Sequence, residues 1–181
     1  YDTILLRASG DGVTAALVAK VNQWLREKEN VLLVVWGPCH SKKRLFPMFH
    51  LDPVKAPFLW ETSVAFHPRE RITETYKDRR KRTRTRSTWP HLTAFTTAGG
   101  DTVEDGETRL ACTFSGAVEP LIATKENQAV LARWKAPDAV KSVVLFDGAA
   151  DAGPIYTGAL EKLILAVDKE RGAGVKRNRW W

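Results

Sequence analysis

Residues 31–36 are the feature that most constrains how this chain can fold. They read Val-Leu-Leu-Val-Val-Trp, an unbroken apolar run rich in β-branched side chains. A run of this length that closes at Gly37-Pro38 predicts a buried strand ending at a turn. The chain then continues into Lys42, Lys43 and Arg44, so the turn brings three cations to one edge of a domain.

Two further patterns precede this run. Residues 3–6 form a short apolar stretch, which predicts a central strand with apolar side chains on both faces. Residues 13–28 carry apolar side chains at helical spacing, which predicts an amphipathic helix with one core-facing stripe. The chain therefore begins in the order strand, helix, strand. The stripe comprises Val13, Leu17, Val21, Trp24, Leu25 and Lys28.

The segments that follow predict three further elements, in the order strand, helix, strand. Alternating side chains over residues 58–66 predict a third strand. Residues 69–86, where Ile72 and Tyr76 are spaced i, i+4, are interpreted as a second helix with a cationic end. Residues 90–97 predict a fourth strand. The order βαββαβ predicts an α+β fold, namely a ferredoxin-like domain with an antiparallel sheet.

A Gly/Asp-rich stretch at residues 98–106 is the predicted boundary between two regions, 1–98 and 99–181. The second region is interpreted as a strand-rich extension closed by a helix over residues 155–169, followed by a basic and aromatic tail. We expect this extension to contact neighbouring protein. Its predicted strands cover residues 110–114, 129–134 and 142–146.

The distribution of charge predicts what the first region binds. The formal net charge is +7, with a balance of +8 in residues 1–98 and −1 in residues 99–181. This asymmetry favours a polyanionic partner for the first region, and arginine and lysine are the side chains that bind phosphate. The run from 77 to 86 is the strongest candidate. The predicted RNA-contacting residues are Lys42, Lys43, Arg44, Lys77, Arg79, Arg80, Lys81, Arg82, Arg84 and Arg86.

Patterns that could indicate catalysis are incomplete. His91-x-Thr93 is one half of the paired His-x-Thr arrangement of a phosphodiesterase, and no second copy follows any other histidine. Asp147-Gly148 with Asp151 could hold magnesium after a strand, but the sequence lacks a glycine-rich phosphate loop. A turn that leads into a helix explains these residues more simply. Cys39 and His40 are adjacent rather than spaced as metal ligands. We therefore expect no catalytic residue, metal or cofactor.

An opening tyrosine, Trp36-Gly37 followed by a basic run, and Leu45 occur together with the strand-helix-strand order. In these features residues 1–98 resemble the family of the bacterial-type sixth protein of the small ribosomal subunit. Seven residues separate Gly37 from Leu45, where the family has about three, which indicates an insertion. The resemblance implies a non-catalytic constituent of the small subunit that binds ribosomal RNA and neighbouring ribosomal proteins, including the eighteenth small-subunit protein.

The insertion and the extension together favour a mitochondrial ribosome, with the bacterial cytoplasm as the alternative. Other functions on the same scaffold are an RNA-processing enzyme or a free RNA-binding regulator, because a fold does not determine a function. No run approaches the length of a membrane span, so we expect no membrane partner.

Overall fold

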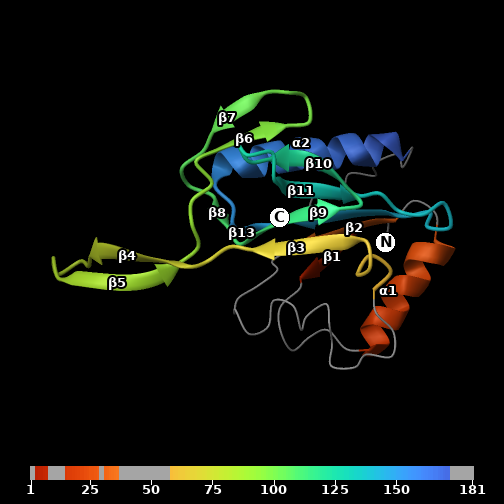
Figure 1. The fold of residues 1–181 in the computed structure, drawn as a ribbon, viewed down its shortest axis with the longest axis horizontal. Coiled ribbons are helices and arrows are strands. Elements are labelled where there is room, and N and C mark those ends of the chain that lie inside the picture. The colour runs from red at the N-terminus through yellow and green to blue at the C-terminus, as the bar shows by residue number, and fades with distance from the viewer. Residues whose placement is uncertain (1–2, 8–14, 29–30, 37–57, 172–181) are drawn as a thin grey trace.

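The computed structural model describes residues 3–7, 15–28, 31–36 and 58–171. Most of the described strands belong to one mixed sheet of nine strands, shown in Figure 1. Its main path is β1 (Thr3–Arg7), β2 (Leu32–Trp36), β12 (Val143–Asp147), β11 (Ala129–Trp134), β10 (Val118–Ala123), β6 (Ala94–Thr97) and β7 (Thr102–Glu104). The remaining two strands are β9 (Cys112–Gly116), which pairs with β11, and β3 (Val64–Pro68), which pairs with β9.

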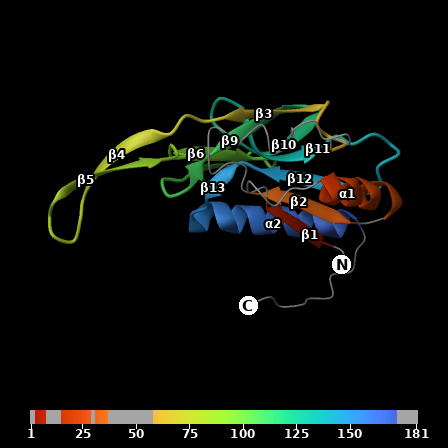
Figure 2. The ribbon, with the colours of Figure 1, turned by 90° about the horizontal axis from the view of Figure 1, so that it is seen from below.

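Two helices and two small sheets complete the described fold. The helices are α1 (Ala15–Glu27) and α2 (Pro154–Glu170). One small sheet pairs β8 (Arg109–Leu110) with β13 (Ala149–Asp151), and the other pairs β4 (Ile72–Lys77) with β5 (Thr83–Thr88). Figures 1 and 2 both show β4 and β5 extending away from the rest of the molecule.

The apolar run of β2 explains how the sheet is covered. Side chains alternate between the two faces of a strand, so an uninterrupted apolar strand needs cover on both. Leu33 and Val35 pack in a hydrophobic cluster that includes Val18, Val21 and Leu25 of α1. Leu32 and Val34 pack in a second cluster that includes Tyr156 and Val167 of α2. One face of β2 is therefore covered on the α1 side and the other on the α2 side, which agrees with the buried strand predicted from its sequence.

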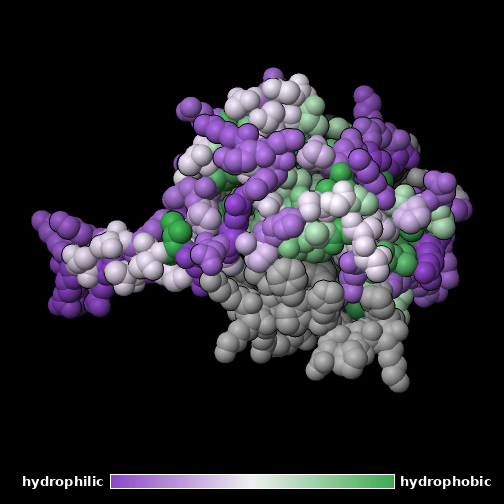
Figure 3. All heavy atoms as spheres, viewed as in Figure 1, coloured by the Kyte–Doolittle hydropathy of each residue, from purple (hydrophilic) through white to green (hydrophobic). Residues whose placement is uncertain are grey.

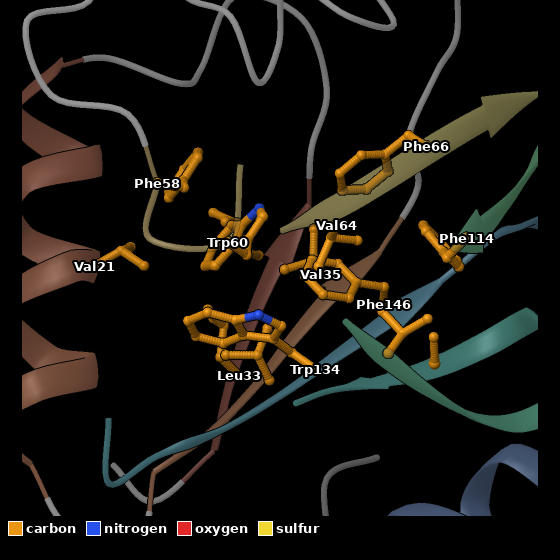
Figure 4. Packing of buried hydrophobic residues seen from close by; sticks show 14 of the residues in the cluster. Val21, Leu33, Val35, Phe58, Trp60, Val64, Phe66, Phe114, Trp134 and Phe146 are labelled. Carbon is orange, nitrogen blue, oxygen red and sulfur yellow. The ribbon is translucent and has the colours of Figure 1, made fainter. Parts of the chain in front are cut away.

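Trp60 lies in the middle of the cluster on the α1 side, and its side chain is fully buried. Its ring stacks on Phe58 with centroids 4.4 Å apart and meets Trp134 and Phe146 edge-on at 6.3 and 5.5 Å. Figure 4 shows these rings together above Leu33 and beside Val64. Aromatic pairs in these geometries add to the stabilisation that burial alone provides.

The predicted ferredoxin-like domain is wrong. β1 and β2 pair directly and in parallel, from Thr3 opposite Leu32 to Arg7 opposite Trp36. A split βαβ arrangement would leave room for another strand between them. On its other side β2 pairs in parallel with β12, which belongs to the predicted extension. The sheet is therefore mixed and much larger than the antiparallel sheet that was expected.

Several individual elements match their predictions. The helices predicted at 13–28 and 155–169 are α1 and α2, and the strand predicted at 129–134 is β11. The predicted second helix at 69–86 is wrong, because this segment forms β4 and most of β5. The strand expected in the centre at 3–6 lies at the end of the sheet path, and Leu5 is 63% exposed there.

The sheet also runs through the predicted boundary near residue 98. That position falls between β6 and β7, which are neighbouring antiparallel strands. Since β2 also pairs with β12 and β3 with β9, both predicted regions contribute strands to one sheet. Within the described ranges, no helix is long and apolar enough to cross a membrane.

Candidate nucleic-acid interface

The hairpin of residues 72–88, called the arm below, carries most of the predicted RNA-contacting side chains. Its strands β4 and β5 project from the body of the molecule in both Figure 1 and Figure 2. Seven of the predicted cations lie on it, and all seven are exposed. The three predicted cations at 42–44 lie outside the described residues. The arm cations are Lys77, Arg79, Arg80, Lys81, Arg82, Arg84 and Arg86.

The composition of the arm favours paired strands. Threonine occurs at every second position near the turn, and β-branched residues favour extended backbone. The register places Thr75 opposite Thr85 and Lys77 opposite Thr83. The two strands thus form a continuous ladder, although a two-stranded sheet has no core of its own and is only marginally stable.

Asp78 closes the turn between the strands. Its backbone N–H donates to the carbonyl oxygen of Arg82 at 2.9 Å, and its carbonyl oxygen accepts from the N–H of Lys81 at 2.8 Å. Its Oδ1 also accepts from the N–H groups of Arg80 and Arg82 at 2.8 and 2.9 Å. Lys81 has a φ of 59°, the left-handed conformation that follows a type I turn in a short hairpin loop. Local hydrogen bonds therefore hold the turn while its charged side chains face solvent.

We expect Lys81→Gly to stabilise the arm by up to about 1 kcal/mol, because glycine adopts the left-handed conformation without the steric cost that lysine bears. Slower amide exchange in β4 and β5 would show this. Lys77→Gly removes the same charge from a strand position and should speed exchange, since glycine weakens a strand by about 0.5–1 kcal/mol. Faster exchange in the Lys81 variant would contradict the strain assigned to this residue.

The two faces of the arm differ in chemistry. One face pairs Glu74 with Arg86 and Tyr76 with Arg84 across the strands. Arg86 donates to Glu74 at 3.1 Å and lies 5.4 Å from the ring centroid of Tyr76, and Arg84 pairs with Asp78 at 3.3 Å. The opposite face presents hydroxyl groups and one lysine. Its residues are Thr73, Thr75, Lys77, Thr83, Thr85 and Ser87.

Four consecutive cations at the outer end of the arm, Arg79, Arg80, Lys81 and Arg82, are called the tip cations below. None of them forms an ion pair with a carboxylate of the described residues. Asp78, the nearest carboxylate in sequence, uses its oxygens on the turn N–H groups and on Arg84. Figure 3 shows strongly hydrophilic residues gathered at this end of the arm. The tip cations are therefore available to an external anion.

Arg109 attaches the base of the arm to the body. Its guanidinium is largely buried and donates to both carboxylate oxygens of Glu74, at 2.6 and 3.1 Å, and to the carbonyl oxygen of Trp89 at 3.0 Å. The hydrogen bond from Arg109 is the main reason that the pKa of Glu74 is lowered. Trp89 is buried, and the guanidinium of Arg71 lies 5.0 Å from its ring centroid. These contacts bind the base of an otherwise coreless hairpin to the sheet.

Sequence reasoning identified the arm cations and missed the residues that place them. Arg109 is 23 residues beyond Arg86, in a region with almost no net charge, so its pairing with Glu74 is not visible in the pattern. Tyr76 was interpreted as the apolar stripe of a helix, whereas it is 43% exposed on a strand. The alternation of threonine with arginine from 83 to 86 was the available signal for a strand.

The two carboxylates considered for magnesium have different surroundings. Asp147 is 1% exposed, and its Oδ1 accepts from the Tyr156 hydroxyl at 2.7 Å and from the N–H of Ala149 at 3.0 Å. Burial raises its pKa to about 6, partly offset by these two hydrogen bonds. Asp151 is exposed on β13. Among the residues that the structure describes, no three potential metal ligands come together.

The other catalytic candidates are separated. His91 lies at the base of the arm, with Nε2 3.6 Å from Glu74 Oε1, and Thr93 is exposed beside it. Cys39 and His40 lie outside the described residues, and Cys112 is buried in β9. The catalytic candidates named from the sequence are therefore not brought together within the described residues.

Comparison with known proteins assigns no family. No protein-family model matches the sequence, and no curated protein is significantly similar to it. Among solved structures, the exo-β-1,4-mannosidase Op5Man5 from Opitutaceae bacterium strain TAV5 has 8% sequence identity and a TM-score of 0.38. That match covers 94% of this chain and 24% of the mannosidase. A likeness this weak carries no argument about fold or function, so the conclusions below rest on the arm.

Proposed function

We propose that this protein binds RNA without catalysis and that the arm is its main contact. The observation that carries the proposal is the set of four consecutive tip cations at the end of a projecting hairpin, outside any ion pair within the described residues. Charges of one sign at adjacent positions repel each other, and a phosphate backbone would neutralise them.

Other features of the arm support a nucleic-acid partner. Arginine forks bind phosphate oxygens through two parallel hydrogen bonds, and three of the four tip cations are arginines. Tyr76 offers an exposed ring for base stacking. The row of threonine and serine hydroxyls on the opposite face can hydrogen-bond to ribose 2′-hydroxyl groups, which distinguish RNA from DNA.

A ribosomal role is a narrower form of this proposal. It rests on the resemblance of residues 1–98, which implied a ferredoxin-like domain that the sheet does not form. The arm supports RNA binding independently of that resemblance. Co-sedimentation with ribosomal subunits at moderate salt would support the narrower role, whereas a free RNA-binding regulator or a processing enzyme would stay in the supernatant.

Replacing all four tip cations by glutamine should weaken RNA binding strongly. Each lost phosphate contact should reduce the slope of log affinity against log salt by about 0.7 for single strands and about 0.9 for duplexes. If all four contact phosphates, affinity for single-stranded RNA at 0.1 M salt should fall roughly 600-fold. Fluorescence anisotropy with labelled RNA over a range of salt concentrations would measure both quantities.

The matched control replaces four exposed cations outside the arm by glutamine, namely Arg26, Lys135, Lys162 and Lys169. Both variants lose four positive charges, three of them from arginine in the tip set and one in the control set. An equal loss of affinity in the two variants, or an unchanged salt slope in the tip variant, would contradict the proposal. Equal affinity of the wild-type protein for DNA of the same sequence would reject the preference for RNA.

A further inference from the structure

A pocket of about 200 Å³ lies outside the arm and has no part in the interface described so far. Leu110 of β8 and three further segments that are distant in sequence line it. One is the chain just before β4, one is the chain just after β5, and one is the turn between β10 and β11. Its polar lining consists of Arg69, His91, Thr93, Thr124, Lys125 and Glu126.

The first two segments are the two ends of the arm. Arg69 precedes the first residue of β4 by three positions, and Pro90 follows the last residue of β5 by two. The N–H of Arg69 donates to the carbonyl oxygen of Ala111 at 2.8 Å, which fixes this end of the arm to the body. A bound polymer that lies along the arm from its tip to its base would therefore reach the pocket.

The lining combines groups of different chemistry. Arg69 and Lys125 supply positive charge, and Thr93 and Thr124 supply hydroxyl groups. The pKa of Glu126 is lowered, mainly because the Thr124 side chain hydrogen-bonds to it, so it is an anion and a hydrogen-bond acceptor at neutral pH. Leu92, Leu110 and the ring of Pro90 provide apolar surface.

Arg69 also has unused hydrogen-bonding capacity. One of its terminal nitrogens donates to the Gln128 side chain, but its buried Nε has no partner among the described residues. Buried side-chain donors are usually paired, so an unpaired Nε in a residue that lines the pocket is unusual.

We propose that this pocket takes a single unstacked nucleotide of an RNA strand whose backbone lies along the arm. The inference rests on the proposed function and adds to it a preference for single-stranded RNA. A pocket of about 200 Å³ is smaller than the roughly 300–1,000 Å³ of pockets that take whole small-molecule ligands, so it suits one unit of a polymer. Cations can bind the phosphate, the carboxylate can accept from a base or ribose donor, and apolar surface can cover a base face.

The test compares a short labelled oligouridylate with an RNA duplex of the same length. The wild-type protein should bind the single strand at least about tenfold more tightly, because a duplex cannot release a nucleotide without losing pairing and stacking. Thr93→Phe fills the pocket without changing charge. This variant should bind both RNAs within about twofold of each other and keep the wild-type salt slope for the duplex.

Two further variants make the result specific. Thr62→Phe places the same side chain at an exposed threonine outside the pocket and the arm, and it should keep the preference for the single strand. Glu126→Ala removes a negative charge yet should reduce the preference several-fold, because it removes the acceptor. This variant also covers the case in which Thr93→Phe fails to fold, since Glu126 is exposed on a turn.

The outcomes separate this inference from the proposed function. Equal wild-type affinity for the two RNAs, or an unchanged preference in both pocket variants, would overturn the nucleotide pocket and leave the arm as an RNA contact. Failure of the wild-type protein to bind either RNA would overturn both.

Discussion

Gly148→Ala should lower the free energy of unfolding by about 3 kcal/mol or more, because overpacking against backbone cannot be relieved by a rotamer change. A Cβ at position 148 would lie 2.1 Å from the carbonyl oxygen of Cys112 and 3.3 Å from a ring carbon of Phe114. The backbone of Gly148 also hydrogen-bonds to residues of two other segments. Its N–H donates to Val130, and its carbonyl oxygen accepts from the N–H groups of Ala111 and Cys112.

Thermal unfolding would show this loss as a fall in Tm of roughly 6–12 °C, since 1 kcal/mol corresponds to about 2–4 °C in a chain of this size. Failure of the variant to fold would be a stronger form of the same result. Gly158→Ala is the control, because no heavy atom lies within 4 Å of its added Cβ and the position is inside α2. That change should stabilise the protein by about 0.5–1 kcal/mol. A Gly148 variant as stable as the wild type would contradict the close approach.

Asp147 should make the protein less stable as the pH rises from about 4 to about 6. Burial raises the pKa of this carboxyl from 3.8 to about 6, so the folded state holds the proton more tightly than the unfolded state. Stability from this group is complete below the unfolded pKa and is lost as pH rises through the folded pKa. A shift of this size corresponds to about 3 kcal/mol.

Asp147→Asn should abolish this pH dependence, because the amide does not titrate. Subtracting the free energy of unfolding of the variant from that of the wild type, at each pH from 4 to 7, isolates the contribution of Asp147. The subtraction is needed because Glu74 and Glu126 have lowered pKa values and contribute with the opposite sign at the acidic end. Chemical denaturation followed by tryptophan fluorescence would provide both curves.

Tyr156→Phe extends the same test. The Tyr156 hydroxyl donates to Asp147 Oδ1 at 2.7 Å and favours the ionised carboxylate. Without it the pKa of Asp147 should rise further, and the loss of stability should continue to higher pH. Asp151→Asn removes an exposed carboxylate from the neighbouring β13 and should leave the wild-type curve unchanged. A flat difference curve between wild type and Asp147→Asn would refute the buried-carboxyl explanation.

Elements defined by local periodicity were predictable from the sequence. The stripe in α1 and the apolar faces of β2 and β11 are short-range patterns, and each element matches its prediction within a few residues. The helix α2 was predicted for the same reason. A periodic apolar pattern specifies the local backbone because only one regular conformation places those side chains on one side.

The arm was misinterpreted because two local signals conflicted. Ile72 and Tyr76 have helical spacing, and arginine and lysine favour helices, so the segment was predicted to be helical. Threonine alternation favours strands, and the turn at Asp78 with left-handed Lys81 allows the two halves to pair. Seven of the predicted cations lie on this hairpin, but their projection from the body depends on Arg109 and Trp89, which no local pattern connects to them.

The sequence by itself determined the two helices, the buried strand at 31–36 and the presence of a dense cationic segment. Only the tertiary structure decided that β2 lies between β1 and β12 and that the cationic segment is a hairpin. It also showed that both ends of the arm meet the β10–β11 turn at a pocket. The physical reason is separation along the chain: β2 and β12 are more than 100 residues apart, and Glu74 and Arg109 are 35 apart. Pairing at such distances depends on which apolar faces and charges fit together. The periodicity of a segment does not indicate which other segment it pairs with.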